Sequence, residues 1–125
     1  MLFDTDVLIW LMRGNDKAAK LVDGTEDRRI SVITYMELLQ GARNKQEIKT
    51  IKSFLSDFSF LMLPLSENIG HRAMIYVEMH GLKVGMYIAD ALIAATAVEN
   101  GLALLTANQR HYRAIPDLDM KVFRP

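Results

Sequence analysis

Carboxylate side chains stand at three well-separated points of the sequence, each at a place where a parallel α/β fold could position a site. Asp4 follows the short apolar segment Leu2–Phe3, Glu37 lies in a helical segment, and Asp90 begins an apolar helix. Asn108 adds an amide just after an apolar strand. Strand ends and the helix starts that follow them share one edge of a parallel sheet. We therefore expect Asp4, Asp90 and Asn108 to converge, with Glu37 reaching them from its helix.

Gathered carboxylates favour the binding of a divalent cation. In a partly desolvated cleft they repel one another, and one or more must take up a proton unless a cation is present. Mg²⁺ and Mn²⁺ prefer hard oxygen ligands and keep several waters. Such an ion lowers the pKa of a bound water and polarises a phosphoryl oxygen. Asp4, Glu37 and Asp90 are thus predicted to hold Mg²⁺ or Mn²⁺ for phosphodiester hydrolysis.

Each of these residues also has a local explanation. Taken alone, Asp90 is typical of a helix N-cap or of a first-turn charge that favours the helix dipole. Glu37 alone is typical of a solvated helix residue, and Asn108 of a turn. Asp6 is a secondary candidate for the site, although it could instead cap the first helix while Asp4 binds the metal.

Apolar periodicity predicts strands that alternate with helices. The expected strands cover residues 2–3, 29–32, 60–63, 102–105 and 121–123, and the expected helices cover residues 7–12, 15–23, 33–42, 46–58, 66–80 and 90–100. Ser66 is the expected N-cap of the fifth helix and Gly81 its stop. Residues 106–114 are expected to form a polar turn or short helix. The alternation favours an α/β fold with a parallel sheet covered by helices on both faces.

The composition indicates a soluble globular protein. The chain has 125 residues, of which 50% are apolar and 24% charged, and we expect one domain over residues 1–125. There is no cysteine for disulfides or zinc thiolates, and no apolar run approaches the roughly 18 residues that span a bilayer. We expect a cytoplasmic protein with no membrane partner. Fifteen basic residues balance 15 acidic ones, so any nucleic-acid binding must depend on a local site.

Four segments of the chain, in this order, resemble the PIN-domain family and its VapC-like toxin branch. They are Leu2–Trp10 (LFDTDVLIW), Ser31–Gly41 (SVITYMELLQG), Ile88–Ala97 (IADALIAATA) and Leu104–Tyr112 (LLTANQRHY). The resemblance runs over nearly the whole chain. It implies a three-layer α/β/α PIN-like fold with a central, mainly parallel sheet. It also implies an endoribonuclease that depends on Mg²⁺ or Mn²⁺ and acts on RNA, often on structured RNA such as tRNA.

The same resemblance assigns roles to individual residues. Asp4, Glu37 and Asp90 match the first three acids of the family, and Asn108 stands where a fourth acid often occurs. Asparagine can offer a carbonyl oxygen but no charge, which disfavours a second tightly held ion. Thr106 resembles the hydroxyl residue of the last motif. We expect it to bond a carboxylate or a metal-bound water, or to serve as a turn hydroxyl.

A basic cluster and two protein partners complete the expectations. Arg110, His111 and Arg113 could hold RNA phosphates beside the cleft, or they could form a solvated turn. The resemblance implies a homodimer and a cognate VapB-like antitoxin whose C-terminal segment brings a basic side chain into the acidic cleft. The helical spacing of Tyr35, Met36 and Leu39 suits the core or dimer contacts.

Two other functions fit part of the pattern. The string LFDTDV also opens haloacid-dehalogenase-like phosphatases, in which the first Asp is a nucleophile and the second a general acid. Those enzymes also need a downstream Lys and an acidic pair, and Lys83 and Lys121 lack that context. The second alternative is a non-catalytic PIN-like module that binds nucleic acid or protein, against which the intact acid trio argues.

Overall fold

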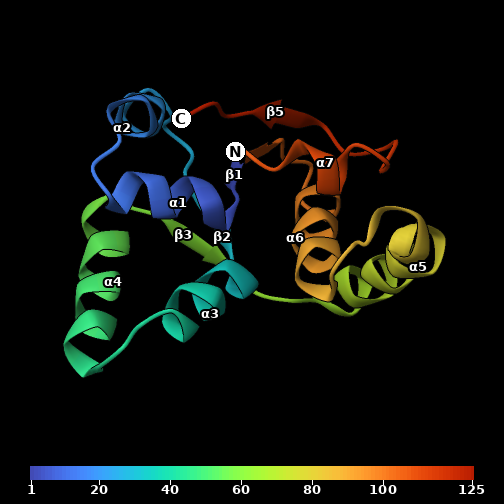
Figure 1. Ribbon diagram of the computed structural model, residues 1–125, viewed down its shortest axis with the longest axis horizontal. Helices are drawn as coiled ribbons and strands as arrows, with labels where there is room; N and C mark the ends of the chain where they lie inside the picture. Colours follow the sequence, from blue (N-terminus) through green and yellow to red (C-terminus); the bar gives the residue numbers. More distant parts are fainter.

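A single parallel sheet organises the chain, which a computed structural model describes over residues 1–125 (Figure 1). The strands are β1 (Leu2–Phe3), β2 (Arg29–Ser31), β3 (Leu61–Leu63), β4 (Leu104–Thr106) and β5 (Met120–Val122). Their order is β3-β2-β1-β4-β5, and every neighbouring pair is parallel. Leu2 of the central strand pairs with Arg29 on one side and with Leu104 on the other. The predicted parallel α/β sheet is therefore confirmed.

Seven helices connect and follow these strands. They are α1 (Thr5–Met12), α2 (Asp16–Asp23), α3 (Val32–Gln40), α4 (Lys45–Asp57), α5 (Glu67–Val84), α6 (Ile88–Glu99) and α7 (Gln109–Tyr112). Side-chain oxygens cap five of them by accepting an amide hydrogen of the first turn, and these caps are Asp4, Asn15, Ser31, Asn44 and Ser66. Such caps satisfy amide groups that have no partner within the helix. Each helix start is thereby fixed close to a strand end or turn.

Adjacent residues of the strands feed two separate cores, one on each face of the sheet. Leu2 and Leu104 pack into a core with residues of α5 and α6, whereas Phe3 and Leu105 pack into a core with residues of α1, α2 and α4. This alternation follows from the period of two along a strand. Figure 1 shows α5 and α6 on one side of the sheet and α1, α2 and α4 on the other. The predicted three-layer architecture is confirmed.

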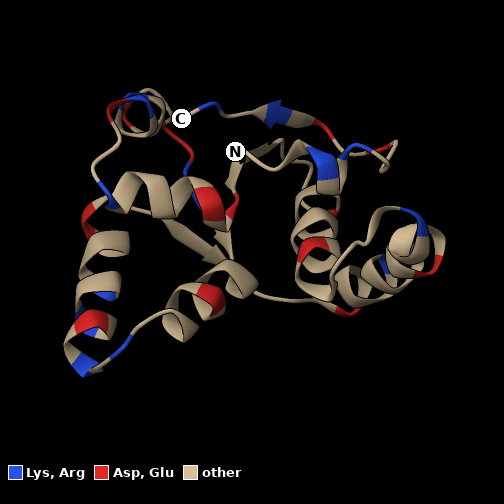
Figure 2. Cartoon of the chain, viewed as in Figure 1, with Lys and Arg blue, Asp and Glu red and all other residues tan.

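The strand order creates a switch point beside β1. The chain leaves β1 for β2 and β3 on one side, and then returns to place β4 and β5 on the other. In such open parallel sheets, ligands bind beyond the carboxyl ends of the strands at this point. Figure 2 shows acidic positions on α1, α3 and α6 around this region. No helix of the structure combines the length and apolar character needed to cross a membrane.

Most expected boundaries differ from the structure by one or two residues, and the differences in α5, α6 and β4 are the informative ones. α5 continues through Gly81 and ends at Val84, next to Gly85, whose φ of 64° is left-handed. One glycine costs a helix only about 1 kcal/mol, so Gly81 was a weak stop signal. α6 begins at Ile88 rather than at Asp90, and Tyr87 holds its N-cap position. β4 extends to Thr106, which is fully buried instead of lying in a polar turn.

Candidate active site

Asp4 lies at the switch point, between the last residue of β1 and the first of α1. Its side chain is only 6% exposed. The backbone amide of Thr5 donates to Oδ1 at 2.8 Å, and the Thr106 hydroxyl at the end of β4 donates to Oδ2 at 2.7 Å. Thr106 Oγ1 in turn accepts from the backbone amide of Asn108 at 2.9 Å. Hydrogen bonds from the start of α1 and from the end of β4 therefore fix this carboxylate.

Asp6 faces the same strand end as Asp4 but is less completely bonded. Its Oδ2 accepts the backbone amide of Ala107 at 3.0 Å, and its Oδ1 is buried with no partner. The interpretation of Asp6 as the cap of the first helix is wrong, because Asp4 holds that position. The parallel pairing of β1 with β4 brings the Ala107 amide to Asp6, so the Asp6 side chain binds this amide and does not cap α1. An unpartnered buried oxygen is costly unless something else binds it.

Burial raises the pKa values of two acids at this site, and neighbouring carboxylates contribute to the shift at Asp4. Burial, assisted by the charges of Asp6 and Asp90, raises the pKa of Asp4 to about 7, although hydrogen bonds from Thr106 and Thr5 oppose the shift. Burial also raises the pKa of Asp6, against the backbone hydrogen bonds that it accepts. Both groups thus resist carrying a negative charge in the metal-free protein. A nearby cation would remove that resistance.

Glu37 reaches the same region from α3 through Thr5. The Thr5 hydroxyl donates to Glu37 Oε1 at 2.6 Å and also lies 3.0 Å from the Thr34 hydroxyl. Because the amide of Thr5 binds Asp4, this single residue connects the first two acids. α3 is positioned for this contact because Ser31, the residue at the end of β2, caps it.

Asp90 is held from α7 instead. Tyr112 donates its hydroxyl to Asp90 Oδ1 at 3.3 Å, and Oδ2 lies 3.0 Å from His111 Nδ1. The same ring nitrogen lies 2.8 Å from the side-chain amide of Asn108. Burial, with the charges of Asp4 and Asp90, raises the pKa of Tyr112, so the phenol keeps its proton. Asp90 is therefore held in place by side chains and is not an N-cap.

The structure brings the predicted residues to one corner without packing the acids into a closed cluster. Asp4 and Asp90 are close enough for their charges to interact, and Thr5 links Asp4 to Glu37. No three carboxylate or imidazole side chains stand close enough together to hold an ion in this arrangement. The donor set is nevertheless the oxygen-rich one that Mg²⁺ and Mn²⁺ prefer, and Asp6 Oδ1 lacks a partner. The chemistry of the corner thus fits a hard divalent cation.

The predicted basic cluster does not act as one unit. His111 turns toward Asp90, whereas Arg110 and Arg113 are exposed and form no ion pair. Sequence reasoning missed Thr5, Thr34 and Tyr112 as part of the site. The threonine between two acids in the string DTD was the available signal for Thr5, while nothing local marks Thr34.

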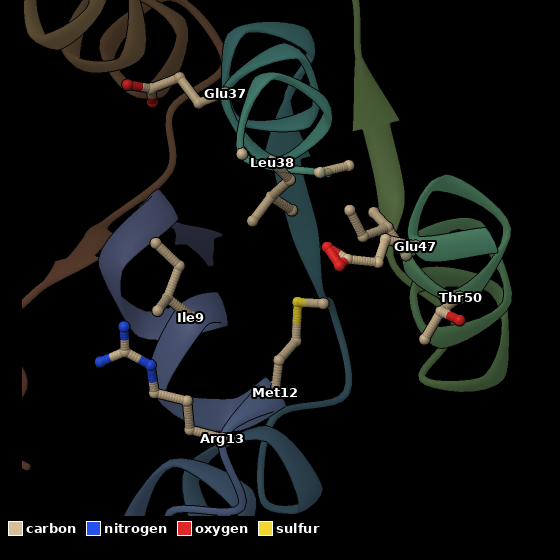
Figure 3. Close-up of a pocket in the computed structure, with 10 residues that line it drawn as sticks. Ile9, Met12, Arg13, Glu37, Leu38, Glu47 and Thr50 are labelled. Carbon is tan, nitrogen blue, oxygen red and sulfur yellow. The ribbon is translucent and has the colours of Figure 1, made fainter. Parts of the chain in front are cut away.

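A groove lies next to Glu37, between α1, α3 and α4 (Figure 3). Its volume is about 480 Å³. Ile9, Met12, Leu38 and Ile51 give it an apolar lining, and the charged residues along it are Arg13, Glu37 and Glu47. Figure 3 shows the Ile9, Met12 and Leu38 side chains directed into the groove. An extended apolar surface therefore adjoins the acidic corner.

Known ribonucleases are similar in sequence to this chain. Ribonuclease VapC19 of Mycobacterium tuberculosis is 33% identical over 125 residues, which cover 94% of this chain and 95% of that protein. Ribonuclease VapC1 of Rickettsia felis is 32% identical over 126 residues, which cover 96% of this chain and 93% of the relative. Both are similar along nearly their whole length.

Solved structures give the same result. A toxin-antitoxin complex from Klebsiella pneumoniae contains a chain that is 30% identical, with a TM-score of 0.78 and coverage of 94% of this chain and 93% of the other. VapBC-1 from nontypeable Haemophilus influenzae matches at 25% identity and a TM-score of 0.81, covering 97% and 96%. The PIN domain family matches residues 1–115. This match disfavours the phosphatase alternative, and it shows that the chain belongs to the PIN domain family.

Proposed function

We propose that this chain is a metal-dependent endoribonuclease and the toxin of a VapBC-type toxin-antitoxin pair. The relatives named ribonuclease VapC support this proposal over nearly the full chain. The observation that carries it is the buried Asp4 carboxylate, which is held from the start of α1 and the end of β4 and lies near the charges of Asp6 and Asp90. RNA is the proposed substrate, with structured RNA such as tRNA as the expected class, and the cytoplasm is the expected location.

The carboxylates are proposed to hold the cofactor. Asp4, Glu37 and Asp90 would be the ligands of Mg²⁺ or Mn²⁺, and the unpartnered Asp6 Oδ1 is available to the ion or to one of its waters. When bound, the ion would polarise a phosphoryl oxygen and lower the pKa of the attacking water. Its charge would also offset the burial and the neighbouring carboxylate charges that raise the pKa of Asp4.

Neutral side chains around the acids serve to fix their positions. Thr106 holds Asp4 Oδ2, Thr5 holds Glu37, and Tyr112 holds Asp90. Each of these three contacts is a hydroxyl donor on a carboxylate oxygen, and each adds no charge to the corner. Ordered ligands bind an ion with less loss of conformational entropy, so these hydroxyls would raise affinity for the cofactor.

The groove beside Glu37 is the proposed docking site of a VapB-like antitoxin. Structures similar to this chain are toxin-antitoxin complexes. An apolar segment of the antitoxin would cover Ile9, Met12 and Ile51, and a basic side chain would then approach Glu37. Occupation of this groove would place a competing positive charge at the proposed cation site and would inhibit the enzyme without a change in fold.

A second copy of the chain is the proposed partner of another apolar surface. Met36 is 46% exposed, and it lines a hollow with Ile33, Leu39 and Ala89. Ile88, at the start of α6, is 71% exposed. Exposed apolar surface of this kind marks protein interfaces. A homodimer through α3 and the start of α6 would cover it.

Cleavage of total RNA by the purified protein tests the enzymatic proposal. We expect cutting with Mg²⁺ or Mn²⁺ and none with a chelator, because the phosphoryl charge then has no counterion. Asp4→Asn and Asp90→Asn should lose cleavage by about 10³-fold or more while remaining folded. Asp23→Asn, the same change at an exposed position of α2, is the matched control and should cut normally. Equal cutting by all four proteins would refute the nuclease and leave a binding module.

A further inference from the structure

Asp90, His111 and Asn108 share one ring nitrogen, and that sharing determines how the Asn108 amide is turned. His111 Nδ1 lies 3.0 Å from Asp90 Oδ2 and 2.8 Å from the terminal amide of Asn108. One ring nitrogen carries either a hydrogen or a lone pair in the plane of the ring, so it is a donor or an acceptor but not both. The Asp90 atom and the Asn108 atom that face Nδ1 must therefore be either both acceptors or both donors.

The carboxylate of Asp90 decides which kind this is. An ionised carboxylate only accepts hydrogen bonds, so Nδ1 must carry a hydrogen directed at Oδ2. A protonated ring nitrogen cannot accept from an amide N–H₂ group. With Nδ2 of Asn108 placed 2.8 Å from Nδ1, two donors would face each other. Turning the amide by 180° puts its oxygen there instead, and one N–H is then shared between two oxygens.

This result holds for either charge state of the ring. The neutral tautomer with a hydrogen on Nδ1 and the doubly protonated ring both donate from that nitrogen. The Tyr87 ring packs edge-on against the imidazole at a centroid distance of 6.0 Å and leaves Nδ1 to its two polar neighbours. The Asn108 oxygen thus faces Nδ1 of His111, and the N–H₂ group lies on the side of the amide away from the ring.

The turned amide exposes its N–H₂ group. Asn108 is half-buried, and its second terminal amide atom has no hydrogen-bond partner in the protein. That atom is nevertheless open to solvent, because Asp6 Oδ1 is the only buried side-chain atom without a partner. The backbone amide of Asn108 is already bound to Thr106. The residue is therefore held at two points, with a neutral donor presented outward.

We propose that Asn108 binds a phosphate oxygen of the RNA through this N–H₂ group, and that His111 is the positioning residue that orients it. This inference rests on the ribonuclease function proposed above. A phosphate approaching Asp4 and Asp90 meets negative charge, so a donor without a carboxylate at this position favours its binding. Asn108 is accordingly proposed to bind the RNA substrate, whereas an acid at this position would bind the metal ion.

The orientation of the amide can be tested without RNA or metal. Long-range ¹H–¹⁵N NMR distinguishes a protonated from a bare ring nitrogen, and the His111→Asn variant assigns the signals among the three histidines. We expect Nδ1 of His111 to carry a hydrogen at neutral pH. A bare Nδ1 would overturn the proposal, because Asn108 would then be donating to the ring.

Binding of RNA separates the two possible roles of Asn108. In an Asp4→Asn background that cannot cut, we measure the affinity for a labelled RNA by fluorescence anisotropy. Asn108→Ala should weaken binding about tenfold, as expected for loss of a hydrogen bond to a charged group, and Asn108→Asp should weaken it further. Gln109→Glu is the matched control, since it makes the same amide-to-acid change at the exposed neighbour and should have a smaller effect.

Ion binding and the His111 variants complete the test. With Asp4 intact, Asn108→Asp should leave the Mn²⁺ affinity measured by calorimetry within about twofold, and an increase of tenfold or more would overturn the proposal by making this a metal-ligand position. His111→Asn keeps an N–H near the place of Nδ1, so it should retain RNA affinity that His111→Ala loses. If the parent Asp4→Asn protein binds no RNA, the proposal for Asn108 fails, whereas the ribonuclease function is decided separately by the cleavage assay of the wild type. The NMR result would still report the orientation of the amide.

Discussion

The Thr106 hydroxyl donates to Asp4 Oδ2 at 2.7 Å and so joins the ends of β4 and β1 across 102 positions of sequence. Thr106 Oγ1 also accepts a hydrogen bond from the backbone amide of Asn108 at 2.9 Å, which ties the start of α7 to this point. One buried hydroxyl therefore positions both a carboxylate and the loop that carries Asn108. Its removal should affect the site more than the fold.

We predict that Thr106→Val lowers RNA cleavage by about 10- to 100-fold, since the isosteric change leaves Asp4 Oδ2 without its donor. Thr96→Val is the matched control. Thr96 is also fully buried, but its hydroxyl bonds Leu92 within α6. Both variants should lose about 1 kcal/mol of unfolding free energy, and only Thr106→Val should lose activity. Similar cleavage rates for the two variants would remove Thr106 from the site.

Stability without divalent ions should fall as pH rises through neutrality. The pKa of Asp4 is raised from 3.8 to about 7 in the folded protein, so folding favours the protonated form. This contribution is complete below the unfolded pKa and is lost as pH rises through about 7. The melting temperature in chelator should therefore drop more between about pH 5 and about pH 8 for wild type than for Asp4→Asn. Parallel pH profiles would show that Asp4 is already ionised at pH 5.

Divalent ions should reverse this loss. A ligand that binds only the folded state stabilises it by mass action, about 2.7 kcal/mol at 100 times its Kd. We expect Mg²⁺ or Mn²⁺ to raise the melting temperature of wild type at about pH 8, with a smaller rise for Asp90→Asn. Asp23→Asn again provides the control and should respond like wild type. Identical shifts in all three proteins would indicate ion binding elsewhere.

Gly81 within α5 and Gly85 just after it test where this helix ends. Gly81 lies inside the helix, and an added Cβ would sit 3.6 Å from the Val77 side chain, an ordinary contact. Gly81→Ala should therefore stabilise the protein by up to about 1 kcal/mol. Gly85 has a φ of 64°, so Gly85→Ala should destabilise it by about 1 kcal/mol. Urea unfolding measures both, and destabilisation by Gly81→Ala would place the helix end at Gly81.

Local patterns in the sequence were sufficient for most elements. The apolar strands, the Ser66 cap and the two-sided helical cover could be predicted, because each depends on neighbouring residues. The roles of Asp6 and Asp90 could not be predicted in the same way. The hydrogen bond of Asp6 to Ala107 depends on the pairing of β1 with β4. The contact of Asp90 with His111 depends on α7, 21 residues later in the sequence. Such contacts are decided by tertiary packing, which overrides local propensity.

The central place of β1 also determines when the catalytic corner can exist. A ribosome makes β1 first, but β4 and α7 come near the end of the chain. A nascent polypeptide that stops within α5 carries Asp4 and Glu37, but it lacks the Thr106 hydroxyl that holds Asp4 and the helix that carries Asp90. The site therefore forms only after β4 and α7 have been synthesised, and a product truncated within α5 should lack the proposed ribonuclease activity.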